Sequence, residues 1–150
     1  MQKSPLFLLI LLITVSSVLG GCSYVTGELP ELSFSSPASE QVIKNVSPAD
    51  AYALYSLNFG HFDFTVMDVR TPKEYASGHI PGALNRDFSS ISFGQSIDEL
   101  NKDHVYLVYC EAGGRSAAAT SDMVRRGFTH IYNMTGGYSA WAADGLPVTQ

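Results

Sequence analysis

The chain has 150 residues, of which 45% are hydrophobic and 15% are charged, and its formal net charge is −5. This length fits one domain, and the composition is too apolar for a wholly disordered chain. The negative charge argues against binding to a nucleic-acid backbone, which requires a basic face. Two cysteines are too few for a disulfide-stapled fold or a four-cysteine zinc site.

The N-terminal segment has the proportions of a secretory signal. Lys3 gives a weakly basic start, and an unbroken apolar run over 6–13 follows it. This run falls short of the roughly 20 apolar residues that a transmembrane helix needs. Residues 1–21 are therefore predicted to be a signal peptide, which places the rest of the chain outside the cytoplasm.

The end of this segment, Leu19-Gly20-Gly21-Cys22, resembles the lipobox of prokaryotic lipoproteins. That resemblance implies cleavage before Cys22 and a diacylglycerol on its sulfur, which would anchor the protein to a membrane of the cell envelope. An ordinary cleaved signal and an uncleaved anchor are the alternatives. Residues 22–40 are rich in Ser, Pro, Gly and Glu and are predicted to be a flexible tether, so the folded domain is expected over 41–150.

Helices and strands alternate along the predicted domain. Strands are expected over 64–69, 83–85, 104–109 and 129–132, and helices over 47–58, 71–77, 96–100 and 115–126 and from 137 onward. The strand over 104–109 is nearly all apolar, which is typical of a strand covered on both faces of a parallel sheet. The alternation predicts an α/β fold with a mostly parallel sheet and helices on both faces.

Cys110 stands where this buried strand ends and a glycine-containing loop leads into a helix. The loop amides and the helix N-terminus favour an anion, and Gly113 and Gly114 allow the positive φ angles that such a loop needs. The first anion to benefit is the Cys110 thiolate. Lowering a thiol pKa by about two units raises its ionised fraction at pH 7 from roughly 3% to about three-quarters. A buried, inert cysteine is the alternative.

Three stretches of the domain together resemble a single-domain rhodanese, a sulfurtransferase module. They are Asp68 to Ala83, the loop Cys110 to Arg115 with its Cys-x-x-Gly-x-Arg pattern, and Gly136 to Trp141 followed by Gly145 to Val148. The resemblance spans about residues 41–148, and it implies a rhodanese-like sheet of about five strands.

The resemblance also implies covalent sulfur transfer without a cofactor or metal. Cys110 would take sulfane sulfur from thiosulfate, a polysulfide or a persulfide and pass it to a thiol or to cyanide. The backbone amides of the loop would hold the persulfide; these belong to Glu111, Ala112, Gly113, Gly114 and Arg115. Arg115 would also orient an oxyanion donor. Ser116 would cap the helix or donate a hydrogen bond to the thiolate. A monomer is expected.

Glu111 is unusual beside a nucleophile, because a carboxylate raises the pKa of a neighbouring thiol and repels a dianionic donor. We therefore predict weak turnover of thiosulfate, with a polysulfide or persulfide as the better donor; a side chain that points to solvent would have less effect. Asp68, Arg70 and Glu74 are expected to brace the turn between a strand and a helix.

Two other functions fit parts of the pattern. Cysteine-dependent phosphatases separate Cys and Arg by one residue more than the four found between Cys110 and Arg115, so this smaller loop suits a single sulfur atom better than a phosphate. The other function is a non-catalytic rhodanese-like module that stores sulfur or binds a partner.

Overall fold

The computed structural model describes residues 41–150, so the predicted signal peptide, Cys22 and the tether lie outside the described residues. The strands form one sheet in the order β1-β5-β4-β2-β3, and each pair of neighbours is parallel. The strands are β1 (Val42–Val46), β2 (Phe64–Asp68), β3 (Leu84–Asn85), β4 (Val105–Tyr109) and β5 (His130–Met134). This confirms the predicted α/β class.

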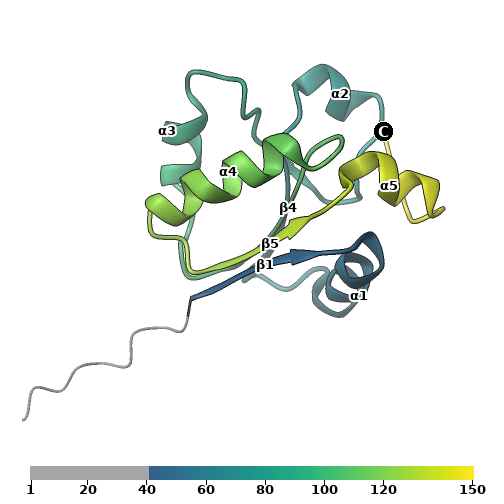
Figure 1. Cartoon of the computed structure of the whole chain (residues 1–150), viewed down its shortest axis with the longest axis horizontal. Helices are drawn as coiled ribbons and strands as arrows, with labels where there is room; N and C mark the ends of the chain where they lie inside the picture. The colour runs from purple at the N-terminus through teal and green to yellow at the C-terminus, as the bar shows by residue number, and fades with distance from the viewer. Residues whose placement is uncertain (1–40) are drawn as a thin grey trace, which may run out of the picture. The chain divides into compact units, whose positions relative to one another are not determined.

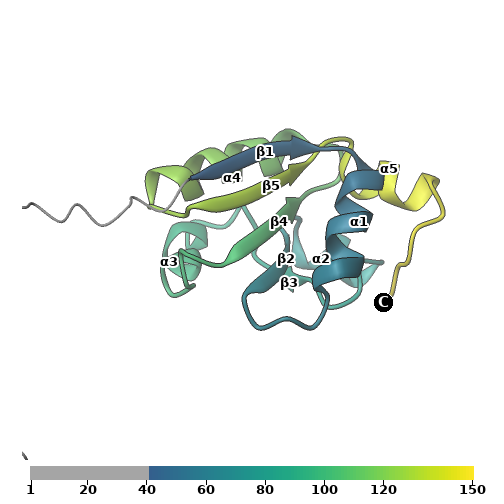
Figure 2. The same ribbon diagram turned by 90° about the horizontal axis from the view of Figure 1, so that it is seen from below.

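Helices cover both faces of the sheet (Figures 1 and 2). They are α1 (Pro48–Asn58), α2 (Pro72–Ala76), α3 (Phe93–Asp98), α4 (Gly114–Arg125) and α5 (Gly137–Ala143). Side chains of α3 and α4 pack with one face of β2 and β4, whereas side chains of α1 and α5 pack with the other. The core therefore has two apolar layers with the sheet between them. No helix within residues 41–150 is long and apolar enough to cross a membrane.

Strand β4 lies in the middle of the sheet and contributes to both layers. Tyr106 and Val108 face α3 and α4, and Leu107 and Tyr109 face α1 and α5; all four are buried. The sequence over 104–109 is thus apolar because helices cover β4 on both faces of the sheet, as expected. Cys110 follows this rigid strand directly, so its backbone position is fixed by the core.

Local sequence signals start the helices on either side of β2. Ser47 caps α1 through a hydrogen bond that its hydroxyl accepts from the Asp50 amide, at 3.2 Å. In α2, Thr71 and Glu74 form a reciprocal capping box. Both helices begin with proline, which suits the first turn.

Two elements differ from the sequence-based expectation. Strand β1 was not predicted, because its three middle residues are exposed and two of them, Lys44 and Asn45, are polar; its pairing with β5 alone makes it an edge strand. Helix α3 begins at Phe93, before the expected start at residue 96, and ends at Asp98. Phe93 is buried against the sheet, so tertiary packing extends this helix toward its N-terminus.

Candidate active site

Cys110 is the first residue after β4, at the edge of the sheet where the parallel strands end. Its sulfur is directed into the loop, and the residue is only 2% exposed. The backbone amide of Gly113 donates a hydrogen bond to Cys110 Sγ over 3.1 Å. Ligands of open α/β sheets bind at this edge, so the thiol lies where the fold favours chemistry.

The environment of the thiol favours its ionised form. Burial raises the pKa of Cys110, but hydrogen bonds to the sulfur lower it by more, so the net shift is downward. The Gly113 amide makes one of these bonds, and the nearby amides of Ala112 and Ser116 and the Ser116 hydroxyl lower the pKa in the same direction. Helix α4 begins at Gly114, and its N-terminal dipole acts in the same direction.

Only one of the two loop glycines has the positive φ angle expected from the sequence. Gly113 has a φ of 100°, and a Cβ there would approach the Gly136 amide nitrogen to 3.3 Å. Gly114 is instead the first residue of α4 and has open space around a Cβ, so the prediction of a positive φ at Gly114 is wrong. One left-handed residue is enough to turn the chain from the loop into the helix.

Ser116 is completely buried beneath the loop. Its hydroxyl donates to the Gly113 carbonyl over 3.1 Å, and the helix begins without a side-chain cap, so the capping role proposed for Ser116 is not observed. A hydroxyl has a single proton, so the hydrogen bond to the thiolate expected from the sequence requires this proton to turn from the Gly113 carbonyl to the sulfur, and it stays a prediction.

Helix α5 anchors the other side of the loop. The Tyr138 amide donates to the Cys110 carbonyl over 2.7 Å, and the Ser139 amide donates to the Glu111 carbonyl over 3.0 Å. Gly137 permits this close approach, because a Cβ there would overlap the backbone of both loop residues. Carbonyls turned toward α5 leave the amides of the following residues free to point at the sulfur.

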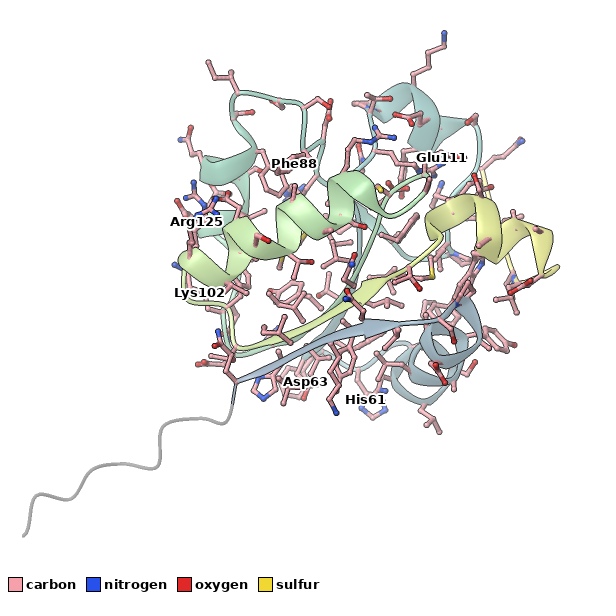
Figure 3. The ribbon with its side chains drawn as sticks, viewed as in Figure 1. His61, Asp63, Phe88, Lys102, Glu111 and Arg125 are labelled. Carbon is pink, nitrogen blue, oxygen red and sulfur yellow. The ribbon has the colours of Figure 1, made fainter. Side chains whose placement is uncertain are left out.

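The Glu111 side chain is engaged rather than simply solvated. Its carboxylate accepts one hydrogen bond from Arg70 Nη1 at 3.0 Å and another from Ser139 Oγ at 2.7 Å, while 43% of the side chain remains exposed. Figure 3 shows Glu111 beside α2 and α5. Its negative charge is therefore partly balanced by Arg70, which weakens the expected effect of Glu111 on the thiol.

Arg70 is a buried cation that joins three parts of the site. It forms a bidentate ion pair with Asp68, donates to the Gly78 carbonyl, and stacks over the Tyr138 ring with its guanidinium carbon 4.1 Å from the ring centroid. Only 1% of Arg70 is exposed. Asp68 and Arg70 thus brace the turn after β2, as expected, and through Glu111 they also brace the loop.

The Arg115 guanidinium faces Glu74. Its Nη1 and Nη2 atoms lie 2.9 and 2.6 Å from the two carboxylate oxygens. Hydrogen bonds from Arg115 and Thr71 lower the pKa of Glu74 far below its usual range. The pair ties α4 to α2. Arg115 can orient a donor only after this ion pair opens, so that role stays a prediction.

Sequence reasoning found the loop but missed the residues that hold it from α5. Gly137 and Ser139 belong to the third stretch that resembles rhodanese, so the signal was present, but nothing in the sequence showed that they contact residues 110 and 111. Within residues 41–150, no group of three or more His, Cys, Asp or Glu side chains is placed to hold a metal ion.

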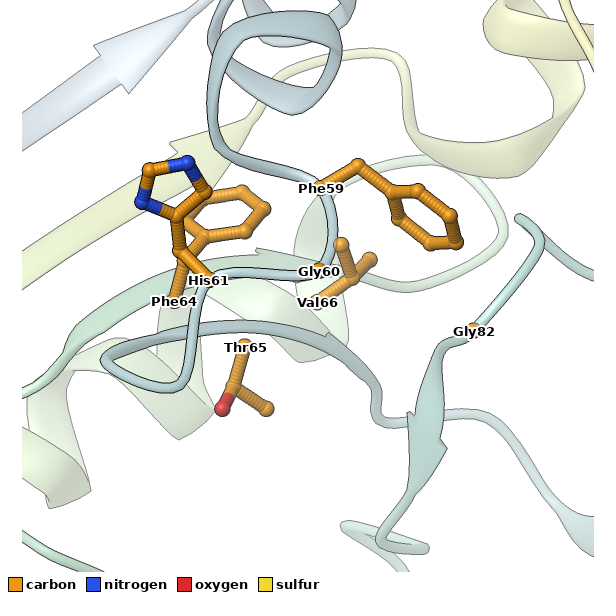
Figure 4. Close-up of a pocket in the computed structure, with 7 residues that line it drawn as sticks. All are labelled: Phe59, Gly60, His61, Phe64, Thr65, Val66 and Gly82. Carbon is orange, nitrogen blue, oxygen red and sulfur yellow. The ribbon is translucent and has the colours of Figure 1, made fainter.

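A hollow of about 230 Å³ lies at the opposite edge of the sheet, where β2 and β3 begin (Figure 4). Its lining is Phe59, Gly60, His61, Phe64, Thr65, Val66 and Gly82. None of these residues belongs to the Cys110 loop or contacts it through a hydrogen bond. The hollow is therefore separate from the candidate active site.

Known structures share this fold. A rhodanese-related protein from Thermoplasma volcanium is 31% identical, with a TM-score of 0.61, and the match covers 71% of this chain and 97% of that one. A rhodanese-like domain protein from Staphylococcus aureus is 26% identical, with a TM-score of 0.58, over 71% of this chain and 99% of its own.

Sequence relatives agree with the structural ones. Thiosulfate sulfurtransferase 16 of Arabidopsis thaliana is 42% identical over an alignment of 91 positions, which covers 54% of this chain and 76% of the relative. The thiosulfate sulfurtransferase GlpE of Pseudomonas entomophila is 35% identical over 98 residues, which are 65% of this chain and 84% of the relative. Residues 49–144 match the rhodanese-like domain as a family. The chain belongs to the family of rhodanese-like domains.

Proposed function

We propose that this protein, a rhodanese-type sulfurtransferase, carries sulfane sulfur as a persulfide on Cys110 and works outside the cytoplasm, anchored to a membrane through Cys22. The observation that supports the chemistry best is the set of amides around one sulfur, with the Cys110 pKa below its ordinary value. A thiolate is the form that attacks sulfane sulfur.

The transfer proceeds in two displacements. The Cys110 thiolate attacks the sulfane sulfur of a donor, a new S–S bond forms, and the donor's S–S bond breaks with its electron pair leaving on the departing group. With thiosulfate the departing group is sulfite. A thiol or cyanide acceptor then attacks the outer sulfur of the persulfide, and the Cys110 thiolate leaves with its electron pair. The loop amides stabilise negative charge on sulfur in both steps.

The direct test is the intact mass of the protein after incubation with a donor. The mass should rise by one sulfur atom with thiosulfate or polysulfide, and a thiol acceptor should remove the added sulfur. Cys110→Ser should gain nothing. A persulfide that forms but does not transfer would support the sulfur-storage alternative, and absence of any persulfide would reject the proposed chemistry.

The choice of donor depends on charge around the loop. Glu111 is half-exposed and carries a negative charge that Arg70 only partly balances, so we expect a polysulfide or persulfide to be a better donor than dianionic thiosulfate. Glu111→Gln should raise kcat/KM for thiosulfate and leave the reaction of an uncharged organic trisulfide nearly unchanged. An unchanged thiosulfate reaction would count against this role for Glu111.

Lipid anchoring rests on the sequence Leu19-Gly20-Gly21-Cys22, outside the described residues. The mass of the mature N-terminal peptide tests it, because a lipidated chain begins at Cys22 and carries acyl chains. An unmodified N-terminus, or one that begins elsewhere, would reject anchoring without affecting the proposal for Cys110.

A further inference from the structure

Three arginines lie at the edge of the sheet where the parallel strands end and Cys110 follows β4. They differ in the groups that they contact. Arg70 is paired with Asp68 and Glu111, and Arg115 is paired with Glu74. Within residues 41–150, Arg86 has no carboxylate at ion-pair distance. Among these three arginines, Arg86 is therefore the one whose positive charge the described carboxylates leave uncompensated.

The strand register places Arg86 in line with the nucleophile. Asp68 is paired with both Asn85 and Tyr109, so the residues that follow, Val69, Arg86 and Cys110, form the next row across three neighbouring strands. The Arg86 amide continues the ladder by donating to the Asp68 carbonyl over 2.8 Å. Two strand spacings, about 10 Å, separate the Cα atoms of Arg86 and Cys110.

Alternation along the strands also places Arg86 and Cys110 on the same face of the sheet. Val69 and Cys110 belong to the apolar layer beneath α3 and α4, and Phe88, two residues beyond Arg86, packs against that layer. Figure 3 shows Phe88 beside α4. Since successive side chains alternate between faces, Arg86 projects to the side of the sheet on which the sulfur lies.

The Arg86 guanidinium has unused donors. Nη1 donates to the Asn85 carbonyl over 3.0 Å, while Nε is buried and has no hydrogen-bond partner among the described residues. A buried donor without a partner is costly, and an oxyanion that accepted from it would remove that cost. The unpaired positive charge of Arg86 and its unpaired Nε–H group both favour an anionic ligand that accepts hydrogen bonds.

We propose that Arg86 binds the anionic end of a small sulfur donor, such as the sulfonate oxygens of thiosulfate, while the sulfane sulfur meets Cys110. The proposal rests on the sulfurtransferase function above and assigns to Arg86 the donor contact that the sequence suggested for Arg115. When the Cys110 thiolate takes the sulfane sulfur, the S–S bond of thiosulfate breaks and sulfite leaves with the electron pair. Arg86 holds the oxygens that carry the charge of this leaving group.

A pair of alkylating reagents tests the site without requiring turnover. Iodoacetate and iodoacetamide have nearly the same shape but differ by one negative charge, so their rate ratio at Cys110 reports the positive charge that an anion meets there. The rates are followed by the mass of the Cys110 peptide in the full chain. Arg86→Gln should lower the iodoacetate-to-iodoacetamide ratio about tenfold, the size of one charge-assisted hydrogen bond.

Arg125→Gln is the matched control. It removes the same charge from an exposed arginine at the far end of α4 (Figure 3) and should leave the ratio unchanged. Arg86→Lys, which keeps the charge, should retain most of the ratio. An unchanged ratio in Arg86→Gln, or an equal fall in Arg125→Gln, would overturn the assignment.

Turnover with two donors gives a second, independent readout. Arg86→Gln should raise KM and lower kcat/KM for thiosulfate about tenfold, with less than about a twofold effect on an uncharged organic trisulfide, which is a sulfane-sulfur donor without an anionic end. Equal losses with both donors would indicate a structural role and contradict the proposal. If the wild-type protein forms no persulfide with either donor, the sulfurtransferase function fails, while the alkylation ratio still decides whether Arg86 attracts anions.

Discussion

The two edges of the sheet are built from different side chains. The edge that carries Cys110 holds paired charges, including the buried Asp68–Arg70 pair and the Glu74–Arg115 pair. At the opposite edge, the loop between α1 and β2 exposes aromatic rings: Phe59 is 54% exposed and Phe62 is 89% exposed. Figure 3 shows His61 and Asp63 of this loop far from Glu111.

The difference shows how one scaffold confines chemistry to one edge. Loops at both edges join strands of the same sheet, but within residues 41–150 only the loop after β4 is held by a following helix, by α5 and by Arg70. Its backbone amides are therefore oriented before any donor arrives. The loop between α1 and β2 instead contributes a hollow and exposed aromatic rings.

The largest expected effect comes from the contact between α5 and the loop. Gly137→Ala should destabilise the protein by about 3 kcal/mol and abolish persulfide formation, because the added methyl group overlaps the backbone of Cys110 and Glu111. Gly145→Ala is the control, since Gly145 also has a positive φ but open space around it; it should cost about 1–2 kcal/mol and retain activity. Equal losses in thermal unfolding would show that backbone strain alone matters.

The hydroxyl of Ser116 should matter next, through the thiolate. Ser116→Ala removes one of the groups that lower the Cys110 pKa, so the pH profile of iodoacetamide alkylation should move to higher pH. At about pH 6 the alkylation rate should fall roughly threefold to tenfold, the value of one hydrogen bond. An unmoved profile with an unchanged melting temperature would remove Ser116 from the set of groups that stabilise the thiolate.

A smaller effect is expected from the pair that ties α2 to α4. The pKa of Glu74 is lowered in the fold, so its ion pair stabilises the protein above the ordinary glutamate pKa of 4.5 and loses that contribution as the pH falls toward the folded value. Glu74→Gln should therefore cost about 1 kcal/mol at neutral pH, since the pair is one-third exposed. In urea unfolding, the gap between variant and wild type should narrow below about pH 4.5; a constant gap would contradict the role of the ion pair.

The opposite edge should contribute least to activity. Phe62→Ser changes a side chain that is almost fully exposed and lies far from Cys110, so kcat/KM and the Cys110 alkylation rate should both stay within about twofold of wild type. A large loss of activity at wild-type stability would mean that the two edges are coupled.

The sequence alone determined the order of most elements, the place of the nucleophile and the chemistry of its loop. These features are local: the apolar run over 104–109 indicates a buried strand, and a strand end followed by glycines and a helix creates a site for an anion. The caps at Ser47 and Thr71 act within one helical turn, so they too could be recognised from neighbouring residues.

The remaining features of the fold and the site were decided only by the tertiary structure, because they depend on contacts between distant parts of the chain. Strand β1 forms because an edge position tolerates its exposed middle residues, and no sequence period reveals that position. The ion pairs of Glu111 and Arg115 each join residues 41 positions apart, and strand register places Arg86 in the row that holds Cys110. The sequence gives the sign of each charged side chain, but its ion-pair partner is set only when the sheet is assembled. That partner decides whether the charge is available to a ligand.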